Sequence, residues 1–344
     1  MTTTTTALRL ADPSLELVRA DEFQLSDEAG LFEGLAASPA RRPKRNPLDP
    51  ARLIHARSWF GAGALAAGLG ALALRQLGWP AAAGLGGLGA AGLAYTTRYE
   101  PAHPRLERVT LSFANLPAEL DGLRVGQISD THLGLRYTEQ NCAWGVEQLA
   151  REQPELIAVT GDLAGCKAGI PPIVPLLKGL RAPLGVYAVP GNHDYWEGMA
   201  DVRGALALAG IPLLINRSLQ LRWNGADLWL AGVDDMFDGR PDYAAARAGI
   251  PAGAFSILLS HAPDTAADAA DYGFALQLSG HSHGGHVRLP GLGALTHPRY
   301  GARYVIGHHR VGALQLYVSR GLGGAAFRMF CPPELTIFTL RRAG

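Results

Sequence analysis

The pattern of hydrophobic and polar positions divides this chain into three parts. Residues 1–57 are mostly polar, residues 58–97 carry very few charges, and short apolar runs alternate with amphipathic patterns from residue 100 onward. Low hydrophobicity does not support a packed core, so we expect residues 1–57 to be disordered. The same pattern predicts a two-helix membrane anchor at residues 58–97 and a folded domain at residues 100–344.

The anchor rests on two uncharged stretches, 58–74 and 76–97, with Arg75 between them. Each is about long enough to cross a bilayer as a helix. Small residues recur at every fourth position, a spacing that lets two membrane helices pack closely. This predicts a transmembrane helical hairpin, and the alternatives are a soluble Ala/Gly-rich helical pair or a helix lying on the membrane surface.

Basic residues are more numerous before residue 58 than in the turn at Arg75. The positive-inside rule therefore places the N-terminus in the cytoplasm. With two spans in a bacterial inner membrane, the folded domain returns to the cytoplasm. With a single span, it lies on the other side.

The folded part alternates predicted strands and helices, which indicates an α/β fold. Apolar runs predict strands at residues 123–129, 156–160, 185–189, 228–233, 255–260, 275–279, 314–319 and 335–340. Amphipathic patterns predict helices near residues 138–153, 199–209 and 264–272.

Five polar motifs follow these predicted strands and carry the candidate chemistry. They are Asp130-Thr131-His132, Gly161-Asp162, Gly191-Asn192-His193-Asp194, Ser260-His261 and Gly280-His281-Ser282-His283. In open α/β sheets, ligands bind beyond the carboxyl ends of the strands. We therefore expect the motifs to converge on one site.

The motifs supply carboxylate, amide and imidazole ligands, which suit divalent metals that accept mixed oxygen and nitrogen coordination. The candidate metal ligands are Asp130, His132, Asp162, Asn192, His261, His281 and His283. This set is large enough for two sites that share one carboxylate, with the two ions about 3.5–4 Å apart. Such a pair binds a phosphoryl oxygen and activates a bridging water.

Charge and cysteine content exclude other classes. The net charge is only +1, which gives no electrostatic basis for nucleic-acid binding. The three cysteines have no CxxC spacing, so neither a disulfide framework nor a structural zinc site is expected.

In order and rough spacing, the five motifs resemble those of the calcineurin-like metallophosphoesterase superfamily, over residues 123–286. Segments 318–323 and 331–335 resemble a membrane-associated bacterial phosphodiesterase branch of the YkuE/YaeI kind. The resemblance covers residues 105–340 and implies that residues 100–344 form a metallophosphoesterase domain. It further implies a four-layer α/β/β/α sandwich with two central mixed sheets.

The resemblance also distributes the ligands between two metal ions. The first ion would be held by Asp130, His132, Asp162 and His283. The second would be held by Asp162 as the bridging ligand, with Asn192, His261 and His281. Mixed ligation of this kind allows Mn, Fe or Zn.

Several neighbours of the ligands receive roles from the same resemblance. His193 would be a catalytic general acid or phosphate contact beside the catalytic carboxylate Asp162. Asp194 would orient a neighbouring imidazole. Arg320 and Arg328 would contact the substrate phosphate. His286 stands where the superfamily has glutamine, so its contact with the substrate is open.

Tyr195 and Trp196 directly follow the Gly191–Asp194 motif, and either a role in lining the cleft or core packing would explain them.

Together these features predict a membrane-anchored phosphoesterase that cleaves a phosphodiester or pyrophosphate through a metal-bridging hydroxide. UDP-2,3-diacylglucosamine, another lipid-linked diester or a nucleotide diester are the expected substrates. The branch dedicated to UDP-2,3-diacylglucosamine has arginine where this chain has His193. The alternatives are a metal-dependent phosphomonoesterase or protein phosphatase, and a non-catalytic membrane scaffold.

Overall fold

The computed structural model describes residues 78–344. The polar segment 1–57 and the first predicted span, 58–74, lie outside the described residues.

Two mixed β-sheets form the centre of the domain. The first has the strand order β1-β13-β2-β3-β4. Its strands are β1 (Arg105–Phe113), β2 (Arg124–Ile128), β3 (Leu156–Thr160), β4 (Val186–Val189) and β13 (Glu334–Arg342). Strands β2, β3 and β4 run parallel, whereas β13 is antiparallel to β2 and parallel to β1.

The second sheet has the order β11-β12-β8-β7-β6-β5. Its strands are β5 (Arg217–Trp223), β6 (Ala226–Gly232), β7 (Ser256–Leu259), β8 (Leu276–Ser279), β11 (Gly307–Val311) and β12 (Leu314–Val318). Strands β6, β7, β8 and β12 are parallel, and the two edge strands are antiparallel to their neighbours.

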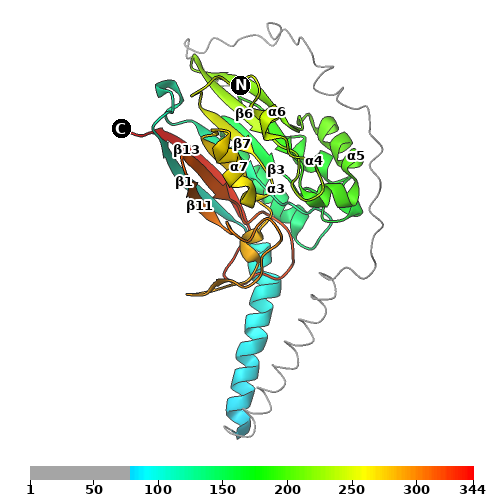
Figure 1. Ribbon diagram of the computed structural model, residues 1–344. Coiled ribbons are helices and arrows are strands. Elements are labelled where there is room, and N and C mark those ends of the chain that lie inside the picture. Colours follow the sequence, from blue (N-terminus) through cyan, green and yellow to red (C-terminus); the bar gives the residue numbers. More distant parts are fainter. Residues whose placement is uncertain (1–77) are drawn as a thin grey trace, which may run out of the picture. The chain divides into compact units, whose positions relative to one another are not determined.

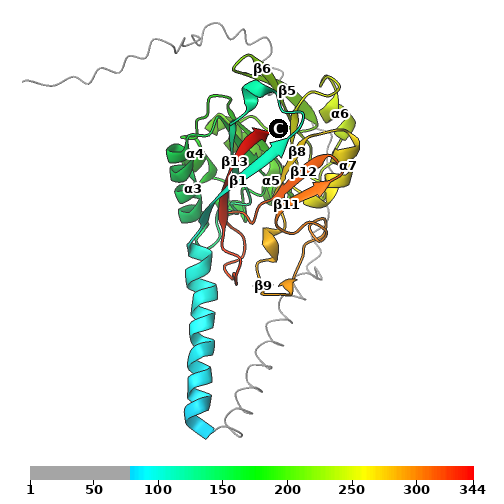
Figure 2. The same ribbon diagram turned by 90° about the vertical axis from the view of Figure 1, so that its left-hand side faces the viewer.

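Helices cover the outer face of each sheet (Figures 1 and 2). The helices are α3 (Thr138–Glu152), α4 (Ile173–Leu177), α5 (Asn192–Ala209), α6 (Tyr243–Arg247) and α7 (Ala266–Asp271). The first three pack on the five-stranded sheet, and the last two pack on the six-stranded sheet. A third hydrophobic cluster joins the inner faces of the two sheets. The expected α/β fold with mixed sheets is thereby confirmed, and its layers follow the order α/β/β/α.

Short elements complete the described chain. They are η1 (Tyr95–Tyr99), η2 (Glu100–Ala102), η3 (Ala118–Leu120), η4 (Lys167–Gly169), η5 (Pro263–Thr265), η6 (His283–Gly285) and the small hairpin of β9 (Arg288–Leu289) and β10 (Gly293–Ala294).

Burial explains which strands the sequence pattern reveals. Strands β3, β7, β8 and β12 are buried at every position, because layers cover both of their faces, and they read as mainly apolar runs with few polar residues. The edge strands β1, β5 and β11 carry exposed or half-buried positions along most of their length. Because polar residues interrupt these strands, they do not form apolar runs, and none of the three was predicted from the sequence.

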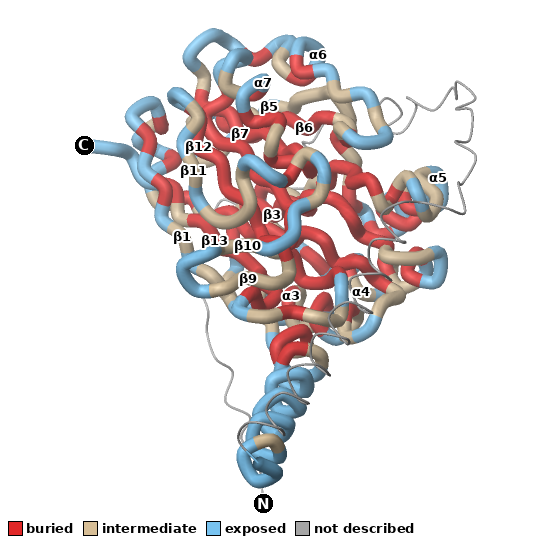
Figure 3. Tube along the Cα trace, turned by 60° about the horizontal axis from the view of Figure 1, so that its bottom comes forward, coloured by how far each residue is buried: buried red, intermediate tan, exposed pale blue. Residues whose placement is uncertain are grey.

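The predicted second span, 76–97, is helical at residues 78–94 and then tightens into the π-helical turn η1. Nearly all of this helix is exposed, as Figure 3 shows, including Trp79, Leu85, Leu88 and Leu93. None of the helices in residues 78–344 combines the length and apolar character needed to cross a membrane. The predicted hairpin therefore has no support from the described residues.

The end of this helix is fastened to the segment that precedes β13. The carbonyl oxygen of Thr96 accepts a hydrogen bond from Arg328 N at 2.9 Å. The carboxylate of Glu100 accepts from the backbone amides of Phe330 (3.0 Å) and Cys331 (2.6 Å). Glu100 is itself buried, so these contacts fix where the helix leaves the domain.

Candidate metal centre

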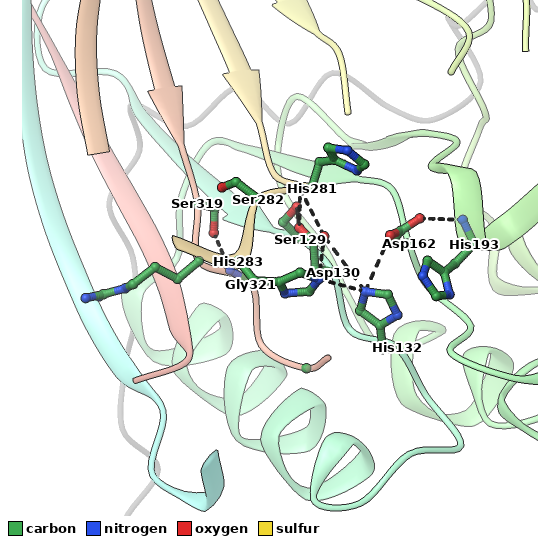
Figure 4. A network of polar contacts seen from close by, with 12 residues as sticks. Ser129, Asp130, His132, Asp162, His193, His281, Ser282, His283, Ser319 and Gly321 are labelled. Atoms are coloured by element: carbon green, nitrogen blue, oxygen red, sulfur yellow. Dashed lines mark hydrogen bonds and ion pairs between the residues drawn. The ribbon is translucent and has the colours of Figure 1, made fainter. Parts of the chain in front are cut away.

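The five polar motifs converge where parallel strands of both sheets end. Figure 4 labels residues from four of these motifs, and they lie close together. Strands β2 and β3 lead into the loops that carry Asp130 and Asp162, and β4 leads to Asn192 at the start of α5. Strands β7 and β8 lead into His261 and His281. Backbone hydrogen bonds join the first two loops: Asp130 N donates to Gly161 O at 2.9 Å, and His132 N donates to Asp162 O at 3.0 Å. The expected convergence of the motifs is confirmed.

Five of the candidate ligands occupy the left-handed backbone region, which non-glycine residues rarely adopt. Their φ angles are 50° at Asp130, 44° at His132, 54° at Asp162, 69° at His281 and 50° at His283. Asp and His tolerate this region better than bulky or β-branched residues do. The sharp turns aim successive side chains of one loop toward the same point.

The first cluster contains Asp130, His132, Asp162 and His283, all buried, with one ligand atom from each within 4.8 Å of the others. His132 Nε2 lies 3.1 Å from His283 Nε2 and 3.4 Å from Asp162 Oδ2. His283 Nε2 lies 3.5 Å from Asp130 Oδ1. The structure thus brings together the four residues assigned to the first metal ion.

The second cluster contains Asp162, His261 and His281. His261 Nε2 lies 3.3 Å from Asp162 Oδ2 and 3.2 Å from His281 Nδ1. Asp162 Oδ2 therefore contacts an imidazole of each cluster. Asn192 Oδ1, the fourth atom assigned to the second ion, is buried and has no hydrogen-bond partner.

Backbone carbonyl groups fix two of these imidazole rings. His261 Nδ1 donates to Thr160 O at 2.8 Å, and His281 Nε2 donates to Arg299 O at 2.7 Å. In a neutral ring the other nitrogen then carries a lone pair. These second nitrogens, His261 Nε2 and His281 Nδ1, face each other, as they would around a shared cation.

The charge balance of the site also fits cations. Burial raises the pKa of Asp130 to about 7. Burial opposes ionisation of Asp162 as well, but the imidazoles of His261, His193 and His132 hold its pKa well below the usual value. Burial likewise opposes charge on His261, yet Asp162 and other nearby carboxylates raise its pKa well above the usual value. Positive charge is therefore favoured at this point.

The other three imidazoles among the candidate ligands, those of His132, His281 and His283, are held neutral. Burial lowers the pKa of His132 to about 3 and that of His281 to about 4, and it lowers the pKa of His283 well below the usual value. Metal ligation requires the neutral form of imidazole. With the orphaned Asn192 oxygen and the facing ring nitrogens, this donor set fits two divalent metal ions.

Asp194 supports the site through the backbone. Its carboxylate accepts from the amides of Asp162 (3.0 Å), Leu163 (2.8 Å) and Gly191 (2.9 Å). None of these three partners is an imidazole, so the predicted orientation of an imidazole by Asp194 stays a prediction. The carboxylate ties the loop after β3 to the start of α5, and burial raises its pKa to about 7.

A buried network of polar side chains is hydrogen-bonded to Asp130, and it was not predicted from the sequence. Ser129 Oγ donates to Asp130 Oδ2 at 2.5 Å, and Thr160 Oγ1 donates to Ser129 Oγ at 2.7 Å. Gln127 Nε2 donates to Thr160 Oγ1 at 2.9 Å. Polar residues inside the apolar runs of β2 and β3 are the signal that would have revealed it, because buried polar groups need partners.

A glycine-containing loop between β12 and β13 was also missed as part of the site. A Cβ atom at Gly321 would lie 2.5 Å from Asp130 Cβ, and one at Gly323 would lie 2.0 Å from Thr131 O. At Gly324 it would lie 2.8 Å from His283 Cε1. Only glycine allows this loop to approach the ligands so closely.

The two arginines predicted to contact substrate have partners within the protein, and these contacts give that prediction no support. Arg328 is 1% exposed, and its guanidinium donates to the carbonyl groups of Arg320, Gly323 and Cys331. Arg320 forms ion pairs with Glu107 and Glu334. Both side chains therefore hold the loop that precedes β13.

His193 and His286 lie against the clusters without belonging to either. The backbone amide of His193 donates to Asp162 Oδ1 at 2.8 Å, and its ring centre lies 4.5 Å from that of His132. The His286 ring stacks on His283 with centres 4.4 Å apart.

The fold and the paired ligand clusters define a metal-dependent hydrolase of the α/β type, and comparison with known proteins agrees. Residues 123–285 match the family described as calcineurin-like phosphoesterase. The chain is 34% identical to the metallophosphoesterase YkuE of Bacillus subtilis, over 73% of this chain and 90% of the relative. It therefore belongs to the calcineurin-like metallophosphoesterases, a family of hydrolases that use two divalent metal ions.

Two further relatives are each 30% identical. Phosphodiesterase YaeI of Escherichia coli matches over 58% of this chain and 73% of its own length. UDP-2,3-diacylglucosamine pyrophosphatase LpxG of Chlamydia trachomatis matches over 68% of this chain and 89% of its own.

Replacing Gly323 with alanine tests whether the loop positions the ligands. The new methyl group would meet Thr131 O at 2.0 Å, so we expect Gly323→Ala to lower the free energy of unfolding by about 1–3 kcal/mol and to lower bound metal per chain. Urea unfolding and elemental analysis measure the two effects. Gly204→Ala is the matched control, because Gly204 lies in an open position on α5, and it should lower neither the free energy of unfolding nor the bound metal per chain. Unchanged metal content and stability in Gly323→Ala would contradict this role.

Proposed function

We propose that this chain hydrolyses a phosphodiester or pyrophosphate bond with two divalent metal ions. Asp130, His132, Asp162 and His283 would hold the first ion, and Asp162, Asn192, His261 and His281 the second. The observation that carries the proposal is Asp162 Oδ2, which lies 3.4 Å from His132 Nε2 in one cluster and 3.3 Å from His261 Nε2 in the other.

Such ions supply Lewis-acid binding of phosphoryl oxygens and lower the pKa of water to produce the nucleophile. The chain's own residues supply the geometry. The carbonyl groups of Thr160 and Arg299 keep the His261 and His281 rings in a single orientation. Asp194 fixes the backbone of the shared ligand Asp162. Direct attack by water also accounts for the missing serine or cysteine nucleophile motif.

His193 is assigned to the leaving group. It lies at the start of α5, half-buried, with its amide on Asp162 and its ring beside His132. From this place the imidazole can donate a proton to the departing oxygen or a hydrogen bond to the phosphoryl group. His286, stacked on His283, is the proposed second substrate contact.

A diester or pyrophosphate is preferred to a monoester because of the named relatives. YaeI is a phosphodiesterase, and LpxG cleaves the pyrophosphate of UDP-2,3-diacylglucosamine. That lipid-linked nucleotide, or another diester that carries a lipid or a nucleotide, is the substrate class we infer. A monoester preference would favour the phosphatase alternative.

Action at a membrane surface is the second part of the proposal. In the helix at residues 78–94, Trp79 is 74% and Leu88 is 72% exposed. Residues 76–97 contain no charged side chain. Large exposed apolar surfaces are typical of sites that contact a membrane or another protein. The fastening of this helix to the segment at Arg328–Cys331 would then hold the metal centre close to the lipid.

Metal removal tests the hydrolase directly. Chelator-treated protein should lose hydrolysis of bis-p-nitrophenyl phosphate and regain it with Mn²⁺. Asp162→Ala should lose activity by more than about 100-fold together with bound metal, since even partners of metal ligands cost about 10–100-fold when removed. Asp227→Ala, which changes a solvent-accessible carboxylate on β6, should retain both properties. Turnover like that of the wild type in Asp162→Ala would defeat the two-metal proposal.

His193 separates proton donation from metal binding. We expect His193→Ala to keep its metal, because His193 belongs to neither cluster, and to lose about 10²–10⁴-fold in kcat. The loss should be larger for a diester with an alkoxide leaving group than for one with p-nitrophenolate, which needs no proton. Elemental analysis measures the bound metal, and kcat on the two diesters measures the dependence on the leaving group. Loss of metal would rule out both assigned roles, whereas an equal loss on both diesters would rule out proton donation and favour the hydrogen bond to the phosphoryl group.

Membrane attachment is tested with the full chain expressed in bacteria. We expect the protein to sediment with membranes and to stay there through an alkaline carbonate wash. Leu85→Glu with Leu88→Glu should move it into the supernatant while hydrolysis continues, because both side chains are exposed and far in sequence from the ligands. Release of the wild-type protein by the wash would contradict insertion into the bilayer.

A further inference from the structure

A row of aromatic rings leads away from the metal ligand His132. In order it comprises His193, Trp196, Phe237 and Tyr300, which we call the aromatic row. Ring centres are 4.5 Å apart from His132 to His193, 4.4 Å from His193 to Trp196, 5.7 Å from Trp196 to Phe237, and 5.9 Å from Phe237 to Tyr300. Each spacing lies in or near the range of favourable aromatic contact.

The far end of the row returns to the second cluster. The guanidinium of Arg299 lies over the rings of Tyr300 (4.5 Å) and Phe237 (5.7 Å). The carbonyl oxygen of the same residue accepts from His281 Nε2 at 2.7 Å. The row therefore begins beside a ligand of the first cluster and ends beside a ligand of the second.

Three separate segments build the row: the first turn of α5, the loop after β6 and the loop before β11. Trp196 is 43% exposed and Phe237 is 37% exposed. Core packing would bury such rings, so of the two readings that the sequence left open for Trp196, this exposure favours the wall of a binding site. Tyr195, by contrast, is half-buried and donates its hydroxyl to Asp234.

An acyl chain and a planar polar ring are the two candidate ligands for the aromatic row, and the polar groups beside the row favour the ring. Trp196 Nε1 donates to Asp238, and Asp234 lies in the same loop as Phe237. An acyl chain laid here would strip water from carboxylates and from Arg299 without compensation. A nitrogen heterocycle stacks on aromatic faces and brings its own hydrogen-bonding groups.

We propose that the aromatic row binds a planar nitrogen heterocycle, of the nucleobase class, carried on one ester arm of the substrate. The inference rests on the proposed hydrolysis and adds which arm is recognised and by which residues. The phosphoryl group would lie at the metal clusters, with the heterocycle along Trp196 and Phe237. Arg299 would add positive charge beside the arm that links them.

Two diesters with the same leaving group test this proposal. One is the p-nitrophenyl ester of thymidine 5′-monophosphate, and the other is methyl p-nitrophenyl phosphate. The holoenzyme should prefer the first, and Trp196→Ala and Phe237→Ala should each lower its kcat/KM by about tenfold, in line with the loss of a stacked base. Hydrolysis of the methyl diester should change less than about twofold, and Trp196→Phe should restore most of the preference.

Phe330→Ala is the matched control, since Phe330 is an aromatic residue 59% exposed and outside the row. No hydrolysis of either diester with metal present would defeat the proposed function itself. Hydrolysis of both without preference, or an equal loss on both in Trp196→Ala, would overturn the aromatic row as a base site while leaving the hydrolase intact. Competitive inhibition by decyl phosphate that weakens in Trp196→Ala, with no such effect for thymidine 5′-monophosphate, would also overturn it in favour of an acyl chain.

Discussion

One shared carboxylate organises this structure. Asp162 is buried, lies within 3.4 Å of imidazoles from both clusters, and stays ionised because those imidazoles surround it. A buried negative charge is costly unless positive charge meets it. His261, whose pKa Asp162 and other nearby carboxylates raise well above the usual value, supplies positive charge beside it. The residues around Asp162 come from two different sheets, so the site is positioned only when both sheets pack correctly. Correct folding and the ability to bind metal therefore both depend on how the two sheets pack around Asp162.

The supports around Asp162 act mostly through the backbone. Asp194 holds three amides of the neighbouring loops, and carbonyl groups orient two of the rings. Glycines on the facing loops remove the side chains that would push the ligands apart. Such contacts fix the backbone and the rings of the ligands. Arg320 and Arg328 act in a similar way on the loop before β13, through ion pairs and carbonyl groups of the protein.

The central strands and the Asp and His residues that gather in the two clusters could be predicted from the sequence, because buried strands read as mainly apolar runs and the polar motifs follow them directly. The sequence did not predict β1, β5 or β11, whose exposed edges carry polar residues. Residue type alone also gives no sign of the surroundings of Arg328: its side chain is buried and donates to three carbonyl groups, which the sequence pattern does not reveal. Long-range contacts such as Gly323 with Thr131 have no local signal.

The left-handed backbone at Asp130, His132, Asp162, His281 and His283 has an evolutionary consequence. Each such residue stores strain of about 1–3 kcal/mol, which the surrounding fold must offset. Glycine at any of these positions would relieve strain and remove a ligand at the same time. Selection for stability and selection for the ligand set therefore oppose each other at these five positions. The free energy that offsets the strain must come from the packed layers elsewhere in the fold. In a related protein that is no longer selected for catalysis, we expect substitutions to accumulate first at these five positions.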